Sequence, residues 1–328
     1  MSLPDVPKAE LHVHLEGTAK PRLIRKIAQR NGLPLPEGLF ADEHTYDFED
    51  FLDFLRKYDL AASVIRTGED YRDITYEYLR DCAAEGTVYV ELISSPDHAA
   101  EVGLSDAEHF AAIAQGIDDA RDHFGIEARI LSSGVRNFGV EAVEDVARRT
   151  VAEGHPYVVG FNMAGAEDGF PPLDYQRAFE IVTEAGLGCA VHAGEHFGPE
   201  SIRGALQLPG VTRISHGVRA IEDPELVKEL ADRGIVLEVC PTSNVVLRVF
   251  PDYASHPLPQ LRAAGIPVTL GSDDPPYFHT SIGHEYEVAG EQLDCDRTAL
   301  LDITRTALDA AFSDDQVLAG PRSRLPAE

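Results

Sequence analysis

The sequence predicts an α/β fold, a closed (β/α)8 TIM barrel with a helical insertion after the first strand. Eight short apolar runs rich in Val and Ile recur along about 270 residues, and amphipathic stretches separate them. Polar or ionisable residues stand at the C-terminal end of seven runs, which is where a barrel builds its active site. The length of 328 residues suits one such barrel, so we expect a single domain over residues 1–328.

The first run, "ELHVHLEG" (residues 10–17), alternates histidines with apolar residues. Because alternate side chains of a strand share a face, His12 and His14 should project together, with apolar neighbours packing on the other side. Two histidines placed in this way can hold a metal ion.

A helix and then an insertion should follow this strand. "PRLIRKIAQRNGL" (21–33) has apolar residues at helical spacing and Gly32 as a stop signal. From about residue 34 to residue 70, "FEDFLDFLRKYDLAASVI" repeats an apolar face every three or four residues, which predicts an extra helix.

The other seven runs alternate with helical patterns as far as residue 275. They are "VYVELISS" (88–95), "ARILSSGV" (128–135), "YVVGFNMAG" (157–165), "GCAVHAGE" (188–195), "RISHGV" (213–218), "VLEVCPTSN" (236–244) and "VTLGSDDP" (268–275). An open doubly wound sheet would also alternate in this way, but no Gly-x-Gly-x-x-Gly dinucleotide fingerprint follows any run.

The polar residues at the run ends should gather at the rim of the barrel where an active site is built. They are His14 and Glu16, Glu91, Asn162, His192 and Glu195, His216, Ser243 and Asn244, and Asp273 and Asp274. Barrel closure brings the first and last strands together, so His12 and His14 should meet His192 and Asp273. Three imidazole nitrogens and a carboxylate oxygen suit one Zn²⁺ per chain, although iron or cobalt would accept the same ligands.

A zinc ion makes hydroxide available near neutral pH, and the attack then requires proton transfer. Glu195 follows the His192 strand and is placed to give a proton to a ring nitrogen of the substrate. His216 is expected to orient or deprotonate the water, a task that Asp273 can share.

Composition and charge exclude several classes of protein. The formal charge of −28 repels nucleic acid and anionic membrane surfaces, and no apolar run approaches the ~20 residues that span a bilayer. The four cysteines lie far apart without a Cys-x-x-Cys pair, and no signal segment is visible, so we expect a reduced, cytoplasmic protein. Oligomeric state is left open.

The motifs "ELHVHLEG", "GFNMAG", "HAGE", "SHGV" and "SDDP", in this order, resemble those of the adenosine deaminase family over almost the whole chain. The resemblance implies a zinc-dependent hydrolase that replaces the 6-amino group of a purine by oxygen and releases ammonia. It implies that the zinc ligands are His12, His14, His192 and Asp273, that Glu195 is the acid that protonates purine N1, and that His216 holds the attacking water. It also implies that Asp274 contacts N7 of the substrate, that Gly165 contacts N3 and that Glu16 contacts a sugar hydroxyl. His14 is expected beside the substrate as well.

On this resemblance we expect adenosine or deoxyadenosine as the substrate. Adenosine deaminases commonly have Asp where this chain has Glu16, and "SDDPPYF" (272–278) looks closer to bacterial relatives that deaminate adenine or aminodeoxyfutalosine. The longer Glu16 either reaches a displaced ribose or occupies the space of a ribose, and we expect the first. An inactive purine-binding protein is a remote alternative, because such a protein should lack a ligand or the acid and this chain has both.

Overall fold

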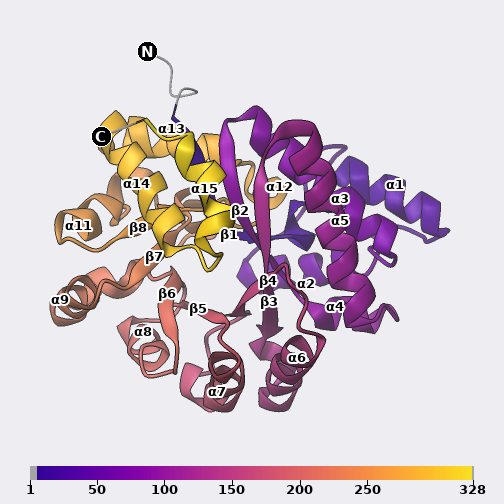
Figure 1. Ribbon diagram of the computed structural model, residues 1–328, viewed down its shortest axis with the longest axis horizontal. Helices are drawn as coiled ribbons and strands as arrows, with labels where there is room; N and C mark the ends of the chain where they lie inside the picture. Colours follow the sequence, from indigo (N-terminus) through magenta and orange to yellow (C-terminus); the bar gives the residue numbers. More distant parts are fainter. Residues whose placement is uncertain (1–5, 327–328) are drawn as a thin grey trace.

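Eight parallel strands form one sheet in the order β1 to β8, as the computed structural model shows for residues 6–326 (Figure 1). The strands are β1 (Lys8–His14), β2 (Thr87–Ser94), β3 (Glu127–Val135), β4 (Val158–Ala164), β5 (Gly188–Ala193), β6 (Val211–His216), β7 (Val236–Val239) and β8 (Val268–Leu270). Neighbours in the sequence are neighbours in the sheet, as right-handed β–α–β connections require. The predicted TIM barrel is confirmed.

The barrel closes where β1 meets the segment after β8. An isolated bridge joins Val13 to Asp273. The amide of His14 donates to the carbonyl of Asp273 at 2.9 Å, and the amide of Asp273 donates to the carbonyl of His12 at 3.2 Å. Closure therefore places Asp273 directly beside both histidines of the first strand.

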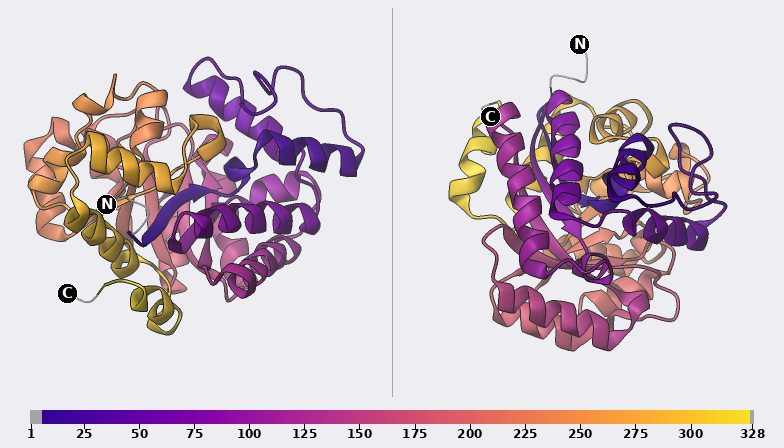
Figure 2. Two further views of the ribbon diagram at one scale, coloured as in Figure 1. Left: turned by 90° about the horizontal axis from the view of Figure 1, so that it is seen from above. Right: turned by 90° about the vertical axis from the view of Figure 1, so that its right-hand side faces the viewer.

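Helices surround the strands (Figures 1 and 2). They are α1 (Pro21–Asn31), α2 (Phe51–Ala62), α3 (Gly68–Ala84), α4 (Pro96–Glu101), α5 (Asp106–Phe124), α6 (Val140–Glu153), α7 (Gln176–Glu184), α8 (Pro199–Ala205), α9 (Pro224–Arg233), α10 (Pro241–Val246), α11 (Leu258–Ala263), α12 (Pro275–Phe278), α13 (Ile282–Gln292), α14 (Arg297–Ala310) and α15 (Asp315–Ser323). Within residues 6–326 no helix combines the length and the hydrophobicity needed to cross a bilayer.

The predicted helix and insertion after the first strand are both present. α1 ends at Gly32, whose φ of 64° is the left-handed conformation that glycine adopts at helix ends. A connecting segment leads to α2, which begins at Asp50 because that carboxylate accepts the amide of Asp53 at 2.9 Å. The left view of Figure 2 shows this indigo and violet segment at one end of the barrel.

The structure corrects the ends of the last two predicted strands. β7 stops at Val239 and α10 starts at Pro241, a residue that cannot donate to a sheet but suits the first turn of a helix. β8 stops at Leu270, so Asp273 and Asp274 lie in a loop. Three further helices, α13 to α15, complete the fold, and α14 packs against β1 and β8.

Candidate active site

A pocket at the C-terminal ends of the strands collects the residues that the sequence predicts. Eight of them line this cavity of about 80 Å³: His14, Glu16, Gly165, His192, Glu195, His216, Asp273 and Asp274. The ninth, His12, is fully buried beside the cavity. Helix α2 contributes Phe51, Phe54, Leu55 and Tyr58 to the lining, so the insertion covers the mouth of the barrel. This role of α2 has no sequence signal beyond its apolar face.

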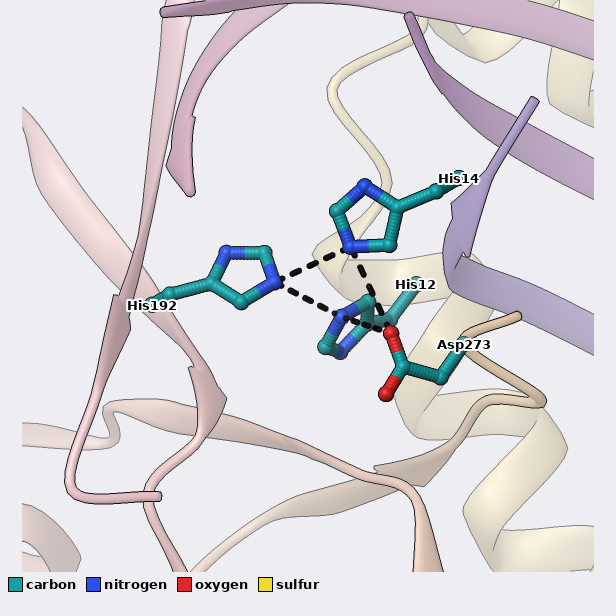
Figure 3. A group of neighbouring side chains, drawn as sticks. All are labelled: His12, His14, His192 and Asp273. Atoms are coloured by element: carbon teal, nitrogen blue, oxygen red, sulfur yellow. Dashed lines mark hydrogen bonds and ion pairs between the residues drawn. The ribbon is translucent and has the colours of Figure 1, made fainter. Parts of the chain in front are cut away.

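Four side chains converge on one point (Figure 3). The Nε2 atom of His192 lies 3.0 Å from Nε2 of His12 and 3.1 Å from Nε2 of His14. Oδ1 of Asp273 lies 3.5 Å from Nε2 of His12 and 3.4 Å from Nε2 of His14. The two strand-one histidines do point the same way, as alternation predicts.

These separations fit a divalent cation. Ligand atoms about 2.1 Å from zinc and separated by angles of roughly 90–110° lie about 3.0–3.4 Å apart, close to the observed spacings. Imidazole nitrogens that face one another at hydrogen-bond distance without a cation would have to share protons. A set of three nitrogens and one carboxylate oxygen is a donor set that zinc accepts.

Neighbouring groups orient the donor atoms. Nδ1 of His12 lies 3.1 Å from the carbonyl of Glu238, and Nδ1 of His192 lies 3.1 Å from Oδ1 of Asn162. Both partners are acceptors, so each Nδ1 carries the hydrogen and each Nε2 presents a lone pair. The Ser243 hydroxyl donates to Oδ2 of Asp273 at 2.7 Å, which leaves Oδ1 facing the histidines.

The partner of His192 belongs to a longer chain of hydrogen bonds, which we call the floor relay: Asn162, Ser215, Glu238 and Arg213. Asn162 donates to Ser215 at 3.2 Å, and Ser215 donates to Glu238 at 2.8 Å. Glu238 pairs with Arg213 at 2.8 Å, and both are buried inside the barrel. Sequence reasoning missed Glu238; its only signal was an acid within the apolar run "VLEVC".

His216 and Glu195 face each other across the pocket. Nε2 of His216 lies 3.6 Å from Oε2 of Glu195 and 3.8 Å from Oδ2 of Asp273. The amide nitrogen of Asn244 lies 3.3 Å from Nδ1 of His216 and donates to it, so the ring hydrogen is on Nε2 and points towards the two carboxyls. His216 and Asp273 both have positive φ, 61° and 63°, and backbone strain of this kind gathers at functional sites.

Burial and neighbouring groups shift the pKa values of the acids of the pocket in different directions. Desolvation, followed by the negative charge of Asp273, raises the pKa of Glu195 well above its usual range. The same two causes raise the pKa of Asp274 well above its usual range. Desolvation acts against ionisation of Asp273 too, but the neighbouring imidazoles, His12 and His14 foremost, outweigh it and hold that pKa well below its usual range. Within one pocket, the pKa values of Glu195 and Asp274 are therefore raised and that of Asp273 is lowered.

Asp274 and Gly165 also line the pocket. Oδ1 of Asp274 is buried and has no hydrogen-bond partner within residues 6–326. A Cβ atom on Gly17 would lie 1.8 Å from this oxygen, so glycine lets Asp274 approach the 3₁₀ turn after the first strand closely. Gly165 has a φ of 100°, a conformation that turns its backbone at the edge of the pocket.

Glu16 is already hydrogen-bonded to the protein. Its Oε1 accepts the Ser94 hydroxyl at 2.7 Å and the Ser95 amide at 3.3 Å, while Oε2 accepts the Tyr58 hydroxyl at 3.1 Å. Only 2% of the residue is exposed. We call Glu16, Tyr58 and Ser94 the Glu16 cluster. No sequence pattern indicates Tyr58 or Ser94 as partners of Glu16, because the three residues come from different elements.

Comparison with known proteins identifies relatives of this chain. A family model described as adenosine deaminase matches residues 7–325. The chain is 50% identical over 318 residues to an adenine deaminase from Chelativorans sp. (strain BNC1), which is 97% of each protein. The crystal structure of adenine deaminase from Arthrobacter aurescens superimposes with a TM-score of 0.91 at 31% identity, covering 98% of each chain.

A second solved structure bears on the metal. An amidohydrolase from Burkholderia ambifaria with bound Zn superimposes with a TM-score of 0.85 at 26% identity, covering 98% of this chain and 90% of that one. The zinc bound in that structure is an ion that the four converging side chains in Figure 3 could also hold.

The relatives contradict the expectation of an adenosine substrate. The similar curated proteins and the Arthrobacter structure are adenine deaminases, so the assignment to adenosine or deoxyadenosine is wrong. The Glu16 cluster supplies a physical reason. Three protein donors, among them the Tyr58 hydroxyl, occupy three of the roughly four lone-pair sites of this carboxylate, which leaves fewer for a ribose hydroxyl.

Proposed function

The chain belongs to the adenosine deaminase family, and from this premise we propose that it hydrolyses free adenine to hypoxanthine and ammonia. The observation that carries the choice of a free base is the Glu16 cluster. Tyr58, Ser94 and Ser95 donate hydrogen bonds to the Glu16 carboxylate, which leaves fewer of its lone pairs for a sugar hydroxyl. The names of the similar curated proteins support the same substrate.

We propose that His12, His14, His192 and Asp273 hold one zinc-like ion. The separations of their donor atoms support this assignment. A zinc ion there supplies Lewis acidity, which makes hydroxide available as a nucleophile near neutral pH.

The other residues bind the purine and move protons. The protonated Glu195 donates to N1 as water adds to C6, and His216 orients that water through its Nε2 hydrogen. The protonated Asp274 donates to N7, and the Gly165 amide donates to N3. Asp273 accepts a proton from the water through Oδ2.

The proton count closes without another reactant. The bond from C6 to the amino nitrogen breaks, and the bond from C6 to the water oxygen forms. One proton of the water leaves with the amino group as ammonia. The other replaces the proton that Glu195 gave to N1, so the enzyme returns to its starting state.

Ammonia release from adenine tests this function, with the shift in ultraviolet absorbance as a second readout. We expect steady turnover of adenine by the zinc-loaded protein. Binding of adenine without ammonia release would favour a purine-binding protein, and turnover of aminodeoxyfutalosine alone would favour that substrate.

A further inference from the structure

We propose that Glu167, in the loop after β4, is a positioning residue that aims Glu195 by holding the backbone of the loop after β5. The role of Glu195 as the acid belongs to the proposed function, so this inference rests on it. Glu167 itself does not line the pocket. Glu167 would therefore affect the reaction only through the position of Glu195.

The carboxylate of Glu167 accepts four consecutive backbone amides. Oε1 accepts those of Glu195 at 2.9 Å, His196 at 3.0 Å and Phe197 at 3.3 Å, and Oε2 accepts that of Gly194 at 2.7 Å. The Ser201 hydroxyl also donates to Oε2. Successive amides that point inward form a concave anion site, and here the anion is a side chain of the same protein. Glu167 is only 6% exposed, so these charge-assisted bonds are shielded from water.

The carboxyl of Glu195 depends on this backbone for its direction. Within residues 6–326 it makes no hydrogen bond to the protein, and the imidazole Nε2 atoms of His216 and His196 lie 3.6 Å and 3.7 Å from its oxygens. A carboxyl kept free to meet a substrate must be aimed by its main chain. The bonds from Glu167 fix that main chain.

The turn at Gly194, just before Glu195, explains why the backbone of this loop has to be held by other groups. Gly194 has a φ of 70°, and a Cβ there would lie 2.4 Å from Cδ1 of Ile202. Glycine permits this turn but does not enforce it, since glycine is also flexible. Glu167 stands two residues after Gly165, so one carboxylate joins the loops that follow the neighbouring strands β4 and β5. A shift of about 1 Å in such a group can cost ~10²-fold in rate.

A double-mutant cycle separates positioning from simple stabilisation. We expect Glu167→Ala to lower kcat for adenine by ~30-fold or more with KM changed less than ~3-fold, because the acid is misplaced while the binding groups remain. In a Glu195→Gln background the same substitution should lower kcat by less than ~3-fold, since no acid remains to aim. Equal losses in both backgrounds would overturn the proposal.

Two further variants make the result unambiguous. Glu167→Gln keeps one acceptor oxygen and should lose an intermediate amount of kcat, and it carries the test if the alanine variant does not fold. Glu200→Gln removes an exposed charge nearby and should leave kcat within ~2-fold of the parent.

Hydrogen exchange provides a readout that is independent of catalysis. The amides of residues 194–197 should be protected in the parent and exchange at least ~10-fold faster in Glu167→Gln, with the strands unchanged. Unchanged exchange at these amides would contradict the proposal. If the parent released no ammonia from adenine, the proposed function would fail, while the exchange result would still decide whether Glu167 holds the loop.

Discussion

Single residues of the pocket carry separable tasks, and Glu195 has the most direct one. Burial and then the charge of Asp273 raise the pKa of its carboxyl, which favours the protonated form that can donate to a ring nitrogen. Glu195→Gln preserves the shape and removes the proton. We expect kcat to fall ~10²–10⁴-fold with KM nearly unchanged, measured by ammonia release. Turnover within a few fold of the parent would show that another group supplies the proton.

We expect Glu16 to determine which purine enters the pocket. Glu16→Ala opens space beside Tyr58 and Ser94, so the preference for adenine over adenosine should narrow by ~10-fold, the scale of selectivity set by pocket shape. Glu16→Gln is the matched control: it keeps the bulk and should keep the preference. If both variants lost the preference equally, the charge of Glu16 rather than its volume would be the cause.

The backbone at Glu16 does not continue the strand that carries His12 and His14. The strand ends at His14, and a 3₁₀ helix, Glu16–Thr18, follows after Leu15, although Glu16 still lines the pocket. The backbone of Leu15 is already helical, with φ of −57° and ψ of −48°. The alternation rule therefore no longer applies at Glu16, although it holds for His12 and His14.

At the scale of elements, strands β4, β6 and β7 cooperate through the floor relay. Asn162→Ala should remove the acceptor that orients His192 and weaken zinc binding ~10–100-fold, the usual effect of losing such a partner. Competition with a chromophoric chelator measures this. Ser243→Ala is a comparison variant that loses the hydroxyl bonded to Asp273 instead. Unchanged zinc affinity in Asn162→Ala would show that the relay serves only to fill the barrel.

Elements with a clear period were predictable from sequence, and long-range partners were not. Apolar runs and the helix that ends at Gly32 follow from local pattern. Glu238 and Glu167 escaped notice because a lone acid carries no signal until its partners, 23 to 34 residues away, are in place. The helices α13 to α15 were also missed, because the strand pattern ends before them.

For the whole molecule, a buried histidine outside the pocket makes stability depend on pH. His109 on α5 is fully buried against Tyr71 of α3 and Ser94 of β2. Desolvation, then the charges of His98 and Arg149, lowers its pKa to about 3. In the unfolded chain the imidazole takes up a proton near pH ~6.5, whereas in the folded protein it stays neutral down to about pH 3. The contribution of neutral His109 to the free energy of unfolding is therefore complete above pH ~6.5 and is lost as the pH falls towards 3.

Equilibrium unfolding in urea tests this linkage. Between pH 7 and pH 5 the free energy of unfolding of the parent should fall by about 2 kcal/mol more than that of His109→Gln, which cannot bind the proton. His44→Gln, at an exposed position, should behave as the parent does. Parallel pH curves for the parent and His109→Gln would contradict the assignment.

At the scale of the whole molecule, we propose that the barrel and α2 enclose a site that accepts a purine without a sugar. The most direct test is the ratio of kcat/KM for adenine to kcat/KM for adenosine, measured on the zinc-loaded parent by ammonia release. We predict that adenine is preferred by at least ~10²-fold. A parent that uses adenosine as well as adenine, or better, would contradict the account.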